Sequence, residues 1–514
     1  MLTRVFSAAL VGVDATEIEI EVNAGPGEPS IIVVGLPDAA VKESKDRVIA
    51  ALANSGYRWP RKRTTVNLAP ADIRKQGPSF DLPIALGMIA TDREEDLPRL
   101  LRCSVAGELA LTGEVRPVKG ALPFTLEARA RGKKAVILPE ANAREASVVG
   151  GIESYGVRTR REAYECLSKA ADLAQVGNGS PGSGEEEGDS QCHDVDFSEV
   201  RGQHRVKRAI EVAVAGSHNL LLVGPPGSGK SMLARRIPTI MPPMSPEEAI
   251  ETTKIHSVCG LLAPGEPIVR KRPFRDPHHT ISDIGLLGGT SHITPGEVSL
   301  AHNGILFLDE LPEFQRSALE VMRQPLEEGR VTVSRASGSL TFPSAFMLVA
   351  AMNPCPCGYH GDPKRECRCS PGQVERYRRK ISGPLLDRID LHVEAPAVAY
   401  GELSDPSPAE SSAAIRSRIM VAREIQTRRF RGSRKVACNA RMSHRHLREH
   451  CRLDAKGDDL LRNAMNDLNF SARAYGRILK VARTIADLGG SEGILREHLL
   501  EALGYRSLDR GILG

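Results

Sequence analysis

One glycine-rich stretch constrains this chain of 514 residues more than any other feature. The run "NLLLVGPPGSGKSMLARRI" enters a tight turn from an apolar, strand-like segment and leaves it in a helical pattern. It matches G-x-x-x-x-G-K-[ST], in which glycines let backbone N–H groups converge on phosphate oxygens. A glycine-rich turn without a ligand is the alternative, but the strand–turn–helix context favours a nucleotide site. The residues predicted to bind ATP are Gly224, Pro225, Pro226, Gly227, Ser228, Gly229, Lys230, Ser231 and Met232.

Two further apolar runs predict strands that end in polar residues. "NGILFLDEL" ends in Asp309 and Glu310, and "SAFMLVAAMNP" ends at Asn353. The carboxyl ends of parallel strands meet at the edge where α/β sheets bind ligands. We expect Lys230 to reach the β/γ-phosphates, and Ser231 and Asp309 to hold Mg²⁺. Glu310 would activate the attacking water and Asn353 would orient it, although a simple Asn-Pro turn is the alternative for Asn353.

Composition and the amino-terminal sequence indicate a soluble protein. Hydrophobic residues make up 41% and charged residues 26%, and no apolar run approaches the roughly twenty residues of a membrane helix. A signal peptide is disfavoured at "MLTRVFSAALVGVDATEIEIEV", because Asp14 interrupts the apolar run and strand-like alternation follows. We expect a first strand here, a cytoplasmic location and no membrane partner.

The chain is too long for one hydrophobic core. The stretch "QVGNGSPGSGEEEGDSQ" is almost free of apolar residues and is typical of a flexible linker. We predict an N-terminal domain at 1–172, a linker at 173–194, an ATPase core at 195–400 and a helical lid at 401–514.

Four cysteines form two C-x-C pairs in "NPCPCGYHGDPKRECRCSPGQ", within a loop at 355–369. Four thiolates suit a tetrahedral, structural Zn²⁺ site, and four protein ligands leave no open position for catalysis. His360 could replace one ligand, and reduced thiols without metal are the alternative. The predicted ligands are Cys355, Cys357, Cys367 and Cys369.

A basic run lies near the carboxyl end. Between Arg428 and Arg452 there are nine Lys or Arg residues and a single Glu. The net charge of +5 is too small by itself to imply a nucleic-acid partner. The run therefore indicates either a solvated helix face or a surface that follows phosphates.

The order of these motifs resembles an AAA+ ATPase, as do the later "GPLLDRIDLHVEAP" and "SARAYGRILKVARTIADL". The sequences "FRDPHHTISDIGLLGG" and "AMNPCPCGY" are similar to those of the magnesium-chelatase-like ATPases, especially their ComM/YifB group. The resemblance implies a ring, expected to be a hexamer, with ATP held between subunits. Arg388 resembles the arginine finger and Arg473 resembles sensor 2, cations that would stabilise transition-state charge. Pairing of Arg388 with Asp387 or Asp390 is the alternative.

Two other motifs in this half carry weaker expectations. The stretch "EGRVTVSRASGSLTFP" predicts a hairpin. In related helicases a hairpin at this point touches DNA, so Arg335 is a candidate DNA contact, with a plain surface hairpin as the alternative. His278 and His279 have no acidic or cysteine partner at ligand spacing, so we expect them in a structural loop.

The first domain resembles the proteolytic domain of Lon in "VGLPDAAVKESKDRVIAAL", "RKQGPSFDLPIAL" and "GEVRPVKGALPFTLEARARGKKAVILPE". Ser79 takes the place of the nucleophile, and a serine there needs a base. Leu122 takes the place of Lon's lysine, and Lys119 lies three residues early. We expect a Lon-like (ribosomal S5-like) α/β fold without peptidase chemistry, in which Ser79 is structural.

Three function classes follow. The ComM/YifB resemblance implies an ATP-driven DNA motor that promotes branch migration when incoming single-stranded DNA recombines during transformation. A chelatase-type ATPase would instead remodel a partner protein that inserts Mg²⁺ into a porphyrin, and an ATP-dependent protease would need the missing lysine. The Lon-like domain, the cysteine cluster and the basic run favour the motor, acting on single-stranded or branched DNA; the chelatase-type ATPase is the alternative.

Overall fold

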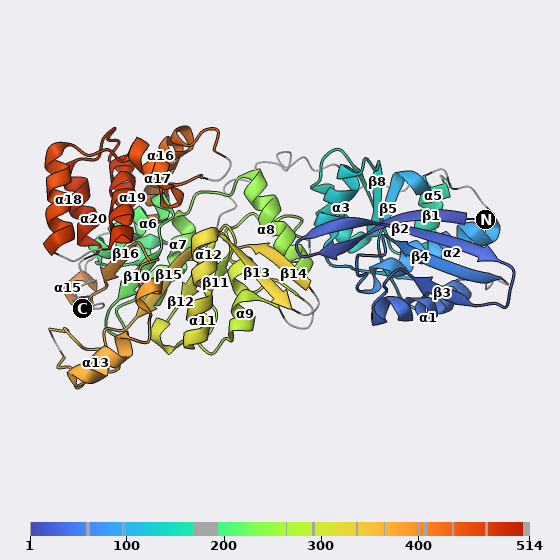
Figure 1. The fold of residues 1–514 in the computed structure, drawn as a ribbon, viewed down its shortest axis with the longest axis horizontal. Coiled ribbons are helices and arrows are strands. Elements are labelled where there is room, and N and C mark those ends of the chain that lie inside the picture. Colours follow the sequence, from blue (N-terminus) through green and yellow to red (C-terminus); the bar gives the residue numbers. More distant parts are fainter. Residues whose placement is uncertain are drawn as a thin grey trace. The chain divides into compact units, whose positions relative to one another are not determined.

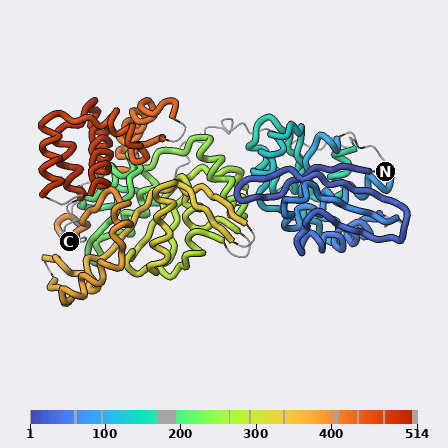
Figure 2. Tube along the Cα trace, viewed as in Figure 1, coloured from blue at the N-terminus to red at the C-terminus, as the bar shows by residue number. Residues whose placement is uncertain are grey.

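The computed structural model of the chain describes most of its residues, and these form two compact units. Unit 1 combines residues 1–188 with 245–270, and unit 2 combines 189–244 with 271–514. Figure 2 traces both along the chain. The segment 245–270 therefore belongs to unit 1, although it lies in sequence between the glycine-rich turn and Asp309. The described residues are 2–57, 62–94, 97, 99–168, 194–263, 265–289, 293–335, 338–363, 365–398, 400–403, 409–433, 436–467 and 471–506.

Unit 1 is built on a seven-stranded sheet in the order β3-β4-β2-β1-β5-β8-β9. The strand predicted at the amino terminus is present as β1, which pairs antiparallel with β2 along its whole length. The other half of the sheet continues parallel through β5, β8 and β9. The strands are β1 (Leu2–Val11), β2 (Asp14–Gly25), β3 (Ile31–Val34), β4 (Arg63–Ala69), β5 (Cys103–Val105), β8 (Ala135–Pro139) and β9 (Glu153–Val157), with a small ribbon of β6 (Glu108–Leu109) and β7 (Val115–Arg116).

Helices cover the sheet of unit 1, and one of them comes from the segment 245–270. This helix, α8, packs against α3, and the backbone N–H of Gly120 donates to the carbonyl of Ser257 at 3.2 Å. The buried Glu145 carboxylate accepts from Ser257 Oγ and, at 2.8 Å, from the N–H of Leu122. These bonds fix α8 to the core of unit 1. The helices are α1 (Ala39–Asn54), α2 (Asp81–Arg93), α3 (Ala121–Ala130), α4 (Glu140–Ser147), α5 (Arg160–Ser168) and α8 (Pro246–Cys259).

Unit 2 contains a five-stranded parallel sheet in the order β11-β12-β15-β10-β16. Strands β10, β12 and β15 are buried along their whole length, which explains why their sequences are continuous apolar runs. These are the three strands predicted around the glycine-rich turn, and the structure confirms them. The strands are β10 (Leu220–Val223), β11 (Phe274–Arg275), β12 (Ile305–Leu308), β15 (Met347–Met352) and β16 (Leu391–Glu394).

Helices surround this sheet, and those from α16 onward gather in one helical region of unit 2 (Figure 1). The predicted hairpin is confirmed as β13 (Arg330–Arg335) and β14 (Gly338–Pro343), which pair antiparallel. The helices of the core are α6 (His204–Gly216), α7 (Lys230–Ile240), α9 (Asp283–Leu287), α10 (Glu297–Leu300), α11 (Arg316–Val321), α12 (Arg323–Glu328), α13 (Pro371–Arg378), α14 (Gly383–Leu386) and α15 (Tyr400–Leu403). The later helices are α16 (Ser412–Arg429), α17 (His444–His450), α18 (Ala455–Asp467), α19 (Ala472–Leu488) and α20 (Arg496–Gly504).

The α/β fold class with a helical carboxyl-terminal region is thus confirmed. Among the described residues, every helix is too short or too polar to cross a bilayer.

A buried polar network links the helices of the helical region to one another. The Asp487 carboxylate on α19 accepts from Arg429 Nη1 at 2.7 Å, from Arg483 Nε at 3.0 Å and from Asn439 Nδ2 at 2.8 Å. The Asp487 side chain is fully buried, and that of Arg429 is only 11% exposed. Arg429, one of the basic-run residues, therefore holds α16 against α19.

We predict that Arg429→Ala destabilises the helical region by about 2 to 3 kcal/mol, because it leaves the buried Asp487 charge with one cation instead of two. Hydrogen exchange of the α16 and α19 amides in the full chain should report this as a loss of protection of roughly 30-fold or more.

The neighbouring Arg428 provides the matched control, since its side chain is 76% exposed and its one acidic partner among the described residues is Glu424, at 3.3 Å. Arg428→Ala should change stability by about 0.5 kcal/mol or less. Equal protection in the two variants would contradict the structural role of Arg429.

Candidate active site

The phosphate loop, residues 224–231, leaves the end of β10 and opens α7. Gly227 and Gly229 have φ of 77° and 84°, a conformation that favours glycine. A Cβ at Gly224 would lie 2.1 Å from the Ala395 carbonyl oxygen, so this position has no room for a side chain. Several N–H groups here have no acceptor within the described part of the chain, as expected of an anion site at a helix start. They belong to Gly227, Gly229, Lys230, Ser231 and Met232.

Lys230 lies at the centre of this loop and is buried. Its Nζ donates to the carbonyl oxygens of Gly224 and Pro225 at 2.7 and 3.0 Å, and to Asn353 Oδ1 at 3.2 Å. Burial lowers the pKa of the Lys230 amine, and the carboxylates of Asp309 and Glu310 oppose that shift. A bound polyphosphate would supply the negative charge that this buried cation lacks.

Ser231 and Asp309 meet on the other side of the loop. Ser231 Oγ donates to one carboxylate oxygen of Asp309, whose other oxygen accepts from the N–H of Glu310 at 2.9 Å. A hydroxyl and a carboxylate are oxygen ligands, which Mg²⁺ prefers when it also binds phosphates. The donor set therefore fits a nucleotide-bound Mg²⁺, and the structure brings together Lys230, Ser231, Asp309 and Asn353 as their motifs suggested.

Glu310 has a neighbour that sequence reasoning missed. Its backbone is left-handed, with φ of 52°, and its half-exposed carboxylate lies 3.4 Å from His279 Nδ1. The imidazole of His279 lies with its centroid 4.1 Å from that of His278, tilted by 33°, and meets the ring of Phe314 edge-on. His279 follows β11, which pairs with β12, so parallel pairing places the two strand ends side by side. One histidine of the pair expected in a structural loop therefore faces the predicted general base.

Arg388 lies in a group of four arginines with Arg323, Arg473 and Arg477. Burial lowers the pKa of Arg388, Glu327 opposes the shift, and the other three arginines add to it. Its side chain is 10% exposed and donates to Glu327 and, at 2.5 Å, to the Pro384 carbonyl. Within the described residues its Nε has no partner.

The acids proposed as alternative partners of Arg388 are not the ones that the structure pairs with it. Asp390 instead binds Arg477 at 2.9 Å and accepts from the N–H of Asn219 at 3.0 Å. Burial acts to raise the pKa of Asp390, but Arg477 and His218 outweigh it and lower that pKa. The Arg473 side chain is exposed and makes no hydrogen bond or ion pair with any described residue.

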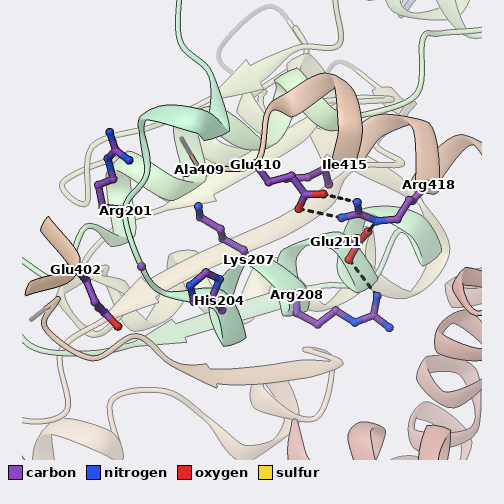
Figure 3. A pocket seen from close by; sticks show the side chains of 11 residues that line it. Arg201, His204, Lys207, Arg208, Glu211, Glu402, Ala409, Glu410, Ile415 and Arg418 are labelled. Atoms are coloured by element: carbon purple, nitrogen blue, oxygen red, sulfur yellow. Dashed lines mark hydrogen bonds and ion pairs between the residues drawn. The ribbon is translucent and has the colours of Figure 1, made fainter. Parts of the chain in front are cut away.

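A cavity of about 380 Å³ lies where the segment before α6 meets α16 (Figure 3). Four of its charged side chains pair with one another: Arg418 binds Glu211 at 2.5 Å and Glu410 at 3.1 Å, and Arg208 binds Glu211 at 3.0 Å. Within the segment before α6, Gln203 Nε2 donates to the carbonyl of Ser228 in the phosphate loop at 2.6 Å. The segment before α6 therefore supports the phosphate loop directly.

The four cysteines of the loop at 355–369 converge. Their sulfur atoms all lie within 4.8 Å of one another, and three of the separations are 3.3, 3.6 and 3.7 Å. A tetrahedral ion with bonds of about 2.3 Å would hold its sulfurs about 3.8 Å apart. The loop touches the phosphate loop, since a Cβ at Gly358 would lie 2.4 Å from Pro226 Cδ.

In unit 1, Ser79 is half-buried ahead of α2, and its hydroxyl has no partner among the described residues. Leu122, at the place of Lon's lysine, is fully buried in an apolar cluster. Lys119 is exposed and lies against Gly260, where a Cβ would be 3.0 Å from its Cε. These positions are compatible with the prediction that unit 1 lacks a serine–lysine pair.

Arg335 ends the first strand of the hairpin. Its Nε donates to the carbonyl of Gly289 at 3.0 Å. This bond gives Arg335 a structural contact and leaves its role toward DNA a prediction.

Comparisons with known proteins cover nearly the whole chain. Three family descriptions match: "Subunit ChlI of Mg-chelatase" at 20–142, "Magnesium chelatase, subunit ChlI" at 196–403, and "Magnesium chelatase, subunit ChlI C-terminal" at 409–506. The chain is 43% identical to the competence protein ComM of Haemophilus influenzae over 99% of its length and 98% of that protein. It is 42% identical, with the same coverage, to the uncharacterized protein YifB of Escherichia coli. Lon protease of Treponema pallidum is 28% identical over 27% of this chain and 16% of its own length. The chain therefore belongs to the ComM/YifB family of magnesium-chelatase-like AAA+ ATPases.

Proposed function

We propose that the chain is an ATP-driven motor that moves branched DNA and so promotes the integration of single-stranded DNA during homologous recombination and natural transformation. The observation that carries this proposal is full-length similarity to a protein named for competence, in a chain whose phosphate loop and carboxylates are arranged for ATP. The motor would work in the cytoplasm as a homo-oligomeric ring, for which we propose six subunits.

Within each ATP site the proposed roles follow from the contacts. Lys230 and the loop N–H groups would bind the β/γ-phosphates, while Ser231 and Asp309 would hold Mg²⁺, which offsets charge on those phosphates. Glu310 would take a proton from the attacking water. Asn353, already bonded to Lys230 Nζ, would orient that water near the same phosphate.

The ring would complete the site from a neighbouring subunit. Arg388 is proposed as the arginine finger, acting on the γ-phosphate bound by the adjacent copy, and Arg473 as the sensor of the lid. The arginine group supports this, because Arg473 within it has no carboxylate partner among the described residues and its charge could be balanced by a neighbour's phosphate. Arg388 would have to exchange its contact with Glu327 for that phosphate.

The test is movement of a branched DNA junction by the purified full chain with ATP and Mg²⁺. We predict ATP-dependent movement by the parent, loss of nucleotide binding in Lys230→Ala, and retained binding in Glu310→Gln. Because Glu310→Gln loses only the general base, hydrolysis should slow by roughly 100-fold or more. Movement without ATP, or at the parent rate in Glu310→Gln, would contradict the assignment.

A second candidate is an ATPase that remodels a partner protein, as in a metal chelatase. The observation in its favour is that all three matching family descriptions carry the chelatase name. This candidate predicts ATP hydrolysis that no DNA alters, whereas the motor predicts stimulation.

We also propose a structural Zn²⁺ held by Cys355, Cys357, Cys367 and Cys369. The convergence of the four sulfurs, with separations close to those of a tetrahedral site, supports the ligand set. The ion would stiffen a loop that packs on Pro226 of the phosphate loop.

We predict about one zinc per chain in freshly purified protein. The double variant Cys357→Ser/Cys367→Ser should lose the metal and raise hydrogen exchange across 355–369, whereas Cys259→Ser, outside the cluster, should keep it. The zinc site would be ruled out if freshly purified parent protein contained no zinc and all four thiols of the loop could be titrated.

A further inference from the structure

The structure divides the basic run between Arg428 and Arg452 into a first part, 428–441, and a second part, 444–452. In the first part Arg428 pairs with Glu424 and Arg429 with Asp487, whereas Arg431 and Arg441 have no carboxylate partner among the described residues. Arg434 and Lys435 lie outside the described residues. In the second part Arg445, Arg448 and Arg452 are exposed. None of these three has a carboxylate partner among the described residues.

The second part forms one continuous surface. A hollow of about 400 Å³ is lined by His444, Arg445, Arg448, Glu449 and Arg452, all on α17 or just after it. Arg452 folds back, and its Nε donates to the carbonyl of Arg448 at 3.4 Å. Glu449, the one acid in this lining, lies 3.9 Å from His450 Nε2. We call His444, Arg445, Arg448 and Arg452 the α17 surface.

The α17 surface stands on a packed support. Leu447 is buried, and α17 packs against α19. The Phe430 ring meets His446 and His450 edge-on, with centroids 5.7 and 5.9 Å away. The α17 surface is therefore presented by an ordered element of unit 2.

Two exposed arginines elsewhere in unit 2 have carboxylate partners. Arg379 binds Glu375 at 2.6 Å, and Arg462 binds Asp458 at 2.6 Å. The cavity of Figure 3 likewise balances Arg208 and Arg418 with Glu211 and Glu410. The α17 surface instead brings together three exposed arginines that have no carboxylate partner among the described residues, beside the single acid Glu449. Such a net positive surface attracts a polyanion.

We propose that the α17 surface binds the phosphate backbone of a nucleic-acid strand. Guanidinium groups match phosphate in a bidentate geometry. At a rise of 1.5 Å per residue, Arg445 and Arg448 are only about 4.5 Å apart along the helix, so they can reach neighbouring phosphates. None of the described residues between 428 and 452 is an exposed large hydrophobic, whereas the centre of a protein–protein interface is apolar. This inference rests on the proposed DNA motor and locates one of its DNA contacts.

The test compares two triple variants of the full chain that remove the same charge. Arg445→Gln/Arg448→Gln/Arg452→Gln alters the α17 surface, and Arg379→Gln/Arg428→Gln/Arg462→Gln alters exposed arginines that already have carboxylate partners. Binding of labelled oligothymidylate is measured by fluorescence anisotropy across a salt series, together with the DNA-free ATPase rate.

For the α17 triple we expect the slope of log K against log salt to become shallower by about 2, because each lost phosphate contact on a single strand contributes about 0.7. Affinity near 0.1 M salt should fall by roughly tenfold or more. The control triple should keep the parent slope, and both should keep the parent DNA-free ATPase rate.

Three outcomes would overturn the inference. If the parent binds DNA and the α17 triple keeps the parent slope, the α17 surface is not a DNA contact. The motor proposal is then unaffected. Parent protein that binds no DNA removes the motor proposal itself. An α17 triple that binds DNA normally but no longer binds poly-L-glutamate would assign the surface to an acidic protein instead.

Discussion

The hydrogen bonds of Lys230 are the interaction around which the rest of unit 2 is organised. One buried ammonium joins two carbonyls of the phosphate loop to Asn353, so β10 and β15 end at the same point. On the other side of that loop, Ser231 bonds to Asp309 at the end of β12. Parallel pairing of these strands makes the arrangement unavoidable, because all three carboxyl ends lie along one edge of the sheet.

Several arginines of unit 2 have a structural role that is set by the acidic residue they contact. Arg429 is buried against Asp487 and stabilises the helical region, Arg418 balances the acids of a cavity, and Arg388 is held by Glu327 beside three other arginines. The α17 surface differs, because its arginines pair with no acid in the part of the chain that the structure describes. In the proposed DNA motor, paired cations would fix the helices, and unpaired ones would bind phosphates and release counterions.

Local sequence determined what could be predicted. The phosphate loop, the buried strands and the hairpin each lie within a short continuous stretch, so pattern alone indicated β10, β12, β15 and the β13–β14 ribbon. Partners distant in sequence could not be predicted in this way. His279 reaches Glu310 only because β11 pairs with β12, and Arg388 pairs with Glu327, 61 residues earlier. The basic run was a single feature in the sequence, but burial of Asp487 separates Arg429 from the α17 surface.

The steady-state ATPase rate of the purified full chain, measured with and without single-stranded DNA, tests the central claim most directly. If hydrolysis at the Lys230–Glu310 site drives movement on DNA, the rate should rise on adding DNA, and the rise should shrink as salt weakens phosphate contacts. An ATPase rate that is the same with every DNA tested, at low salt as well as high, would contradict the motor and favour remodelling of a protein partner.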